Sequence, residues 1–85
     1  SSSQVSSGSG DTQTLSEGDS NDDVYDMQER LSVLGYLTTT YDGHFGEFTA
    51  EAVKLFQEKN NLKATGKADK ETLELLFSEN AVEND

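Results

Sequence analysis

The residue best suited to catalysis is His44, the only histidine in the chain, which follows Asp42 by two positions. Histidine has an unperturbed pKa that suits proton transfer near neutral pH. As a general base, His44 would need an orienting carboxylate, which Asp42 could supply, together with a nucleophile or a water molecule. The chain has no cysteine, and no serine lies in a nucleophile-elbow sequence. We therefore interpret His44 as a turn residue, and we predict no catalytic residue.

A second segment with possible chemistry is Asp19-Ser20-Asn21-Asp22-Asp23, which resembles the start of a calcium-binding loop. An EF-hand loop requires glycine at its sixth position and glutamate at its twelfth. Here these positions hold Val24 and Arg30, and arginine would place a cation where the bidentate carboxylate belongs. A single histidine among scattered acids also lacks zinc-ligand spacing. The pattern favours a capped, acidic helix start, so we predict no metal and no cofactor.

A third group consists of aromatic side chains around an Asp-Gly turn. Sugars and peptides are commonly held by apolar surface with a few placed polar groups. If the turn folds back, the aromatic residues could line one groove with their polar neighbours. The alternative is that Tyr36 belongs to the core and that Phe48 packs on Leu55. The candidate ligand-binding residues are Tyr36, Tyr41, Asp42, His44 and Phe48.

Helical periodicity predicts three helices to position these residues. The first covers 22–34, with Ser20 or Asn21 as its N-cap and Gly35 as a left-handed residue after its end. Its apolar stripe is Val24, Met27, Leu31 and Leu34.

The second predicted helix, 47–60, carries a main stripe and a flanking stripe, so we expect it to contact neighbours on two sides. The third begins near Asp69, a suitable N-cap, and runs to Phe77. The main stripe of the second helix is Thr49, Ala52, Val53 and Phe56, and its flanking stripe is Phe48, Ala52 and Leu55. The inward residues of the third helix are Leu73, Leu76 and Phe77.

The sequence also contains an internal repeat. The segment 43–49 (GHFGEFT) parallels 66–72 (GKADKET), and upstream of each lies an apolar helix that carries Gln28 or Gln57. A buried amide must find hydrogen-bond partners. We therefore expect each glutamine to bond the backbone of the turn that follows it, and we expect two stacked units to share one core.

Four ordered blocks carry a family resemblance: 15–19, 24–37, 42–57 and 65–76. Together they resemble the peptidoglycan-binding domain of bacterial cell-wall hydrolases. The resemblance implies an all-α fold, a small three-helix orthogonal bundle that is not itself catalytic and is usually tethered to a lytic enzyme domain. One departure is Phe48, which occupies a position that is usually polar in this pattern.

The polar ends of the chain are predicted to lie outside the folded unit, 15–78. Residues 1–14 hold six serines and two glycines in their first ten positions, which predicts a flexible linker. Residues 79–85 are expected to form a frayed acidic tail. No signal peptide is visible, and a chain that starts Ser-Ser-Ser-Gln is expected to be a piece of a longer protein. The Ser/Gly segment before the folded unit favours a catalytic domain on its N-terminal side; the alternative is that a signal and linker precede it.

The charge of the chain restricts its partners. Acidic residues outnumber basic ones 17 to 6, for a net charge of −11, and such a surface disfavours nucleic acids and anionic membranes. No segment is apolar for the roughly 18 residues that would indicate a transmembrane helix. The resemblance implies a monomer that binds a glycan or stem peptide of peptidoglycan in the bacterial cell wall or envelope. The acidity motivates an alternative, a protein-docking module within a larger envelope enzyme.

Overall fold

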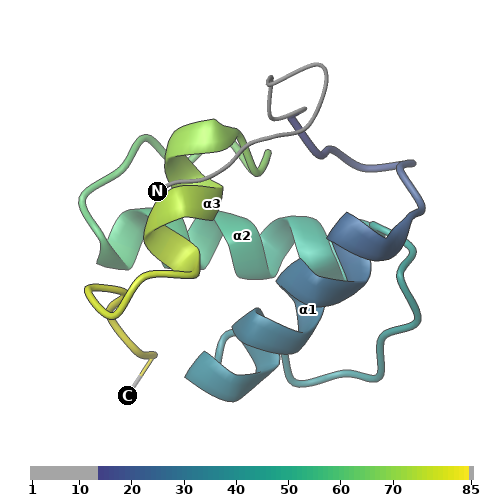
Figure 1. Cartoon of the computed structure of the whole chain (residues 1–85), viewed down its shortest axis with the longest axis horizontal. Coiled ribbons are helices and arrows are strands. Elements are labelled where there is room, and N and C mark those ends of the chain that lie inside the picture. The colour runs from purple at the N-terminus through teal and green to yellow at the C-terminus, as the bar shows by residue number, and fades with distance from the viewer. Residues whose placement is uncertain (1–13, 85) are drawn as a thin grey trace.

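The computed structural model describes residues 14–84, which form three crossing helices (Figure 1). They are α1 (Asp22–Leu34), α2 (Glu47–Lys59) and α3 (Lys70–Leu76). The predicted three-helix orthogonal bundle is confirmed. The second helix was expected to contact neighbours on two sides, but its main helical neighbour is α1, which packs against both α2 and α3, whereas α2 and α3 contact each other less.

The helix ends follow the predicted capping chemistry. The side chain of Asn21 accepts a hydrogen bond from the Val24 amide at the start of α1, and that of Asp69 accepts from Thr72 at the start of α3. After α1, Gly35 adopts a φ of +92° that few other residues tolerate. Predicted and observed bounds agree within one or two residues, and Asn60 serves as the C-cap of α2.

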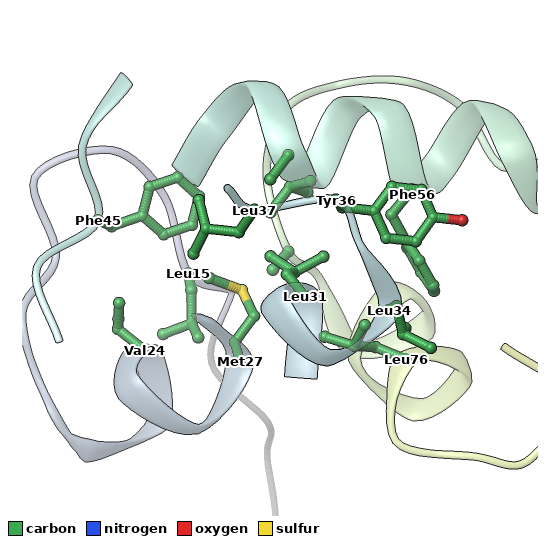
Figure 2. Packing of buried hydrophobic residues seen from close by; sticks show 13 residues of the cluster. Leu15, Val24, Met27, Leu31, Leu34, Tyr36, Leu37, Phe45, Phe56 and Leu76 are labelled. Atoms are coloured by element: carbon green, nitrogen blue, oxygen red, sulfur yellow. The ribbon is translucent and has the colours of Figure 1, made fainter. Parts of the chain in front are cut away.

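The core is a continuous apolar cluster that lies along α2 (Figure 2). It runs from Phe45 at one end to Tyr36 and Phe56 at the other, and both phenylalanines are fully buried. The predicted stripe of α1 is buried, as is the main stripe of α2.

Phe77 was predicted to face inward but is 51% exposed. Because α3 ends at Leu76, Phe77 is its C-cap and lies beside Arg30 and Val33 in a shallow hollow.

A buried amide organises the first turn. Gln28 is 1% exposed, and its Nε2 donates to the His44 carbonyl at 2.7 Å and to Thr49 Oγ1 at 2.9 Å. Its Oε1 accepts from the Gly43 amide at 2.8 Å. Gly43 has a φ of +91°, so the turn needs both glycine and the amide that holds it.

Gln57 makes the equivalent contacts with the second turn. Its Nε2 donates to the Lys67 carbonyl at 2.8 Å and to Thr72 Oγ1 at 3.0 Å. Its Oε1 accepts from the amides of Thr65, at 2.9 Å, and Gly66, at 3.1 Å. The prediction that both glutamines bond the turns of the repeat is confirmed.

The segment 15–20 ties the two turns together. Leu15 and Ala68 exchange backbone hydrogen bonds of 3.0 and 2.9 Å. Further along the segment, the Gly18 amide donates to the Phe45 carbonyl at 2.9 Å, and the Phe45 amide donates to Asp19 at 2.8 Å. A short N-terminal stretch therefore links the second turn to the first.

The C-terminal segment extends the folded unit beyond its predicted end at residue 78. The Asn84 amide donates to the Leu34 carbonyl at 2.9 Å, and Asn84 Nδ2 donates to the Gly35 carbonyl at 2.9 Å. The Val82 amide donates to Asn60 Oδ1 at 2.9 Å. The expected fraying does not describe residues 82–84, because they supply donors and contacts at the C-terminal ends of α1 and α2.

The predicted linker falls outside the described residues except for Thr14, which is exposed. Among the helices of residues 14–84, none has the length and apolar character needed to cross a membrane.

Replacing either glutamine with methionine should destabilise the domain strongly while keeping side-chain volume. In Gln28→Met, Gly43 and Thr49 lose their partners, and each buried polar group left unpaired costs about 1–3 kcal/mol. Urea unfolding followed by circular dichroism measures the loss. The control is Glu29→Met on the exposed neighbouring position, which should change stability by less than about 0.5 kcal/mol. Equal effects in the two variants would contradict the role of the buried amide.

Deleting residues 82–85 should lower the free energy of unfolding by about 1–2 kcal/mol, because the lost hydrogen bonds are partly offset by the entropy of ordering the segment. The Tyr36 hydroxyl loses its acceptor and Asn60 Oδ1 loses its donor in the same deletion, while Asn60 Nδ2 keeps its bond to the Phe56 carbonyl. Thermal unfolding measures the change, with deletion of Asp85 alone as the control. An unchanged melting temperature would show that the segment does not contribute to stability.

Candidate functional site

A groove of about 450 Å³ lies between the outer face of α2 and the loop after α1. Four consecutive residues of the loop, 36–39, form one wall, and α2 forms the other. The lining residues are Tyr36, Leu37, Thr38, Thr39, Phe48, Glu51, Ala52, Lys54, Leu55 and Glu58. Its volume lies within the range of about 300–1,000 Å³ that is typical of small-ligand sites.

Helical spacing explains the α2 wall. Phe48, Glu51, Leu55 and Glu58 recur at intervals of three and four residues, so they share one face beside the buried stripe. With a rise of about 1.5 Å per residue, this face extends for about 15 Å. Phe48 is 60% exposed. The groove thus offers an accessible phenyl ring one turn from the Glu51 carboxylate, with the Glu58 carboxylate at the other end of the same face.

Tyr36 connects the groove to the core. Its ring packs edge-on against Phe56, with centroids 5.4 Å apart, and its hydroxyl donates to the Val82 carbonyl. Burial raises the pKa of this hydroxyl above its ordinary value of 10.0; the Asn60 side chain opposes the shift and the charge of Glu83 adds to it. Tyr36 is only 6% exposed, so it supports the groove wall more than it offers a free surface.

The other three predicted residues lie at a different place, near the start of α1. Tyr41 packs edge-on against Tyr25, with ring centroids 5.4 Å apart. Asp42 Oδ1 accepts from the backbone amide of His44 at 3.2 Å, which is an Asx-type turn contact. The His44 backbone pairs with Ser20 while its side chain is exposed. The structure therefore brings Tyr36 and Phe48 into one groove and leaves Tyr41, Asp42 and His44 outside its lining.

Sequence reasoning missed most of the polar groove residues: Thr38, Thr39, Glu51, Lys54 and Glu58. The signal that could have found Glu51 and Glu58 is their helical register with Phe48 and Leu55, whereas Lys54 lies on the neighbouring stripe. The loop threonines carry no such signal, because their position depends on how Tyr36 and Leu37 enter the core.

The groove has mixed charge and no sign of metal chemistry. Glu51 and Glu58 provide carboxylates, and Lys54 provides an ammonium group. Within residues 14–84, no three His, Cys, Asp or Glu side chains come together in a way that could hold a metal ion. The available chemistry is hydrogen bonding, charge pairing and stacking on an aromatic ring.

Comparison with known proteins identifies relatives for most of this fold. Residues 20–76 match the family described as "Putative peptidoglycan binding domain". The N-acetylmuramoyl-L-alanine amidase CwlM of Mycobacterium tuberculosis is 43% identical over 56 residues, which cover 66% of this chain and 14% of that protein. The spore cortex-lytic enzyme of Bacillus cereus is 39% identical over 64 residues, which cover 75% of this chain and 25% of that protein.

A solved structure gives the same result for the fold. The crystal structure of the SleB N-terminal domain superimposes with a TM-score of 0.74 at 39% identity, covering 75% of this chain and 88% of that one. The chain spans only about a quarter or less of the curated relatives named above.

Tyr36→Phe should cost about 1 kcal/mol at pH 8, through loss of one hydrogen bond. The pKa of the Tyr36 hydroxyl is higher in the folded state than in the unfolded state, so the hydroxyl of the unfolded chain ionises first as pH rises. The contribution of Tyr36 to stability is therefore lost above about pH 10. The stability gap between wild type and variant should therefore shrink from pH 8 to pH 11 in urea unfolding. The more exposed Tyr25→Phe is the control. A gap that grows with pH would contradict this assignment.

Proposed function

The chain belongs to the family of peptidoglycan-binding domains, and from this we propose that it is a non-catalytic module that targets a tethered enzyme to the bacterial cell wall. The single observation that carries the groove assignment is the exposed Phe48 ring, which shares a face of α2 with Glu51, one turn away, and with Glu58 further along. An exposed aromatic face with nearby carboxylates suits a sugar ring or a peptide stem, because it combines stacking with hydrogen-bond acceptors.

The module supplies local concentration rather than chemistry. A tethered enzyme domain held near its polymer acts at the effective concentration set by the linker. Two of the relatives are, by name, an amidase and a cortex-lytic enzyme. We propose that the partner domain of this chain is likewise a cell-wall hydrolase, that it lies N-terminal to the module, and that the module works as a monomer in the cell envelope.

Within the predicted site, the five candidate residues have different proposed roles. Phe48 provides the contact surface and Tyr36 holds the loop wall against the core. Tyr41, Asp42 and His44 form a separate cluster at the start of α1, and we propose that they contact only those parts of a bound polymer that extend past the groove.

A second candidate function is docking on an enzyme domain of the same protein. The observation that favours it is a hollow of about 340 Å³ between α1 and the end of α3. Its lining includes two exposed apolar side chains, Val33 and Phe77. Asp26, Glu29 and Arg30 complete the lining, so a docked domain would make an apolar contact and place basic groups opposite the two carboxylates.

Phe48→Ala should reduce binding to insoluble peptidoglycan about tenfold, which corresponds to about 1.4 kcal/mol. The matched control is Phe77→Ala, which removes a comparably exposed ring from a different face. Co-sedimentation at low and at physiological salt measures both variants. Because neither ring is buried, both variants should keep their melting temperatures.

Each outcome of this experiment has a distinct meaning. Failure of the wild-type domain to sediment at either salt concentration would overturn wall binding. Loss of binding in Phe77→Ala alone would move the wall site to the α1–α3 hollow.

A further inference from the structure

A second hollow, of about 250 Å³, adjoins the groove on the neighbouring stripe of α2. The two share Glu51 and Lys54, which lie toward the solvent side of the helix. At about 100° per residue, Ala50 and Lys54 lie on one side of Glu51, and Phe48 and Leu55 lie on the other. The lining residues are Glu17, Ala50, Glu51, Lys54, Thr65, Gly66 and Lys67.

The far wall of this hollow is the second turn of the repeat, which a buried group holds in place. Gln57, 1% exposed, accepts from the amides of Thr65 and Gly66 and donates to the Lys67 carbonyl. A Cβ at Gly66 would lie 3.9 Å from Lys54 Cε, so the Lys54 stem reaches from α2 to the turn. The wall is therefore formed before any ligand arrives, which lowers the ordering cost of binding.

The size of the hollow suggests that it does not act alone. Its volume is below the range of about 300–1,000 Å³ of independent ligand sites, whereas the groove lies inside that range. The shared residues make the pair one continuous surface across α2. A ligand that fills the groove and extends past Glu51 and Lys54 would meet the turn next.

On the basis of the proposed function, we propose that this hollow is an extension subsite that accommodates the next unit of the same polymer. The domain then binds an oligomer of peptidoglycan across α2 rather than a single repeating unit. The ammonium groups of Lys54 and Lys67 can pair with stem-peptide carboxylates. Glu17 and Glu51 offer acceptors for sugar hydroxyls and amides.

The test is the dependence of affinity on ligand length. Soluble muropeptides with one disaccharide unit and with two glycan-linked units are titrated against the domain by calorimetry. The two-unit ligand should bind about tenfold more tightly, which exceeds the factor of about two expected from having two equivalent units. The amide chemical shifts of Thr65, Gly66 and Lys67 should change on titration with the two-unit ligand.

The discriminating variant is Lys67→Ala, in which the backbone contact with Gln57 is retained. This variant should bring the ratio of two-unit to one-unit affinity close to the statistical factor of about two. The control is Lys63→Ala, which replaces an exposed lysine that lines neither the groove nor this hollow and should leave the ratio unchanged. A wild-type ratio near two, or equal ratios in the two variants, would overturn the extension subsite. Lack of binding to insoluble peptidoglycan would instead overturn the proposed function itself.

Discussion

The fold depends on two buried side-chain amides. Gln28 and Gln57 each take the place of missing backbone partners in a tight turn, and each also bonds the threonine of the following helix. In a domain of this size, stability is a small difference between large terms. Without the amides, the backbone groups on the inner side of both turns would lose these partners beside the core, which would consume much of that difference.

This arrangement also connects the core to the candidate binding surface. The helix α2 presents Phe56 and Gln57 to the interior and Phe48 and Glu51 to the groove. Gln57 fixes the turn that forms the wall of the second hollow. The rigidity of the surface therefore follows from polar contacts in the core, and a ligand meets walls that are already held in position.

The sequence predicted what depends on local chemistry and missed what depends on long-range packing. Helix bounds, caps and the glutamine contacts follow from periodicity and from the need to pair buried polar groups. The outward position of Phe77 did not follow, because its predicted inward direction assumed a helix that continues through residue 77, whereas α3 ends at Leu76. Nor did the contacts of Asn84, whose partners lie 49 and 50 positions earlier at Gly35 and Leu34.

The predicted binding residues show the same division. Tyr41 and His44 are close to Phe48 in sequence, but the Asp-Gly turn and the Tyr25 contact hold them at the start of α1. Phe48, at the start of α2, is the exposed ring of the groove. On a chain with a net charge of −11, long-range attraction to an anionic polymer is unavailable. Affinity must then come from short-range contacts, and an uncharged ring that stacks without regard to ionic strength is suited to provide them.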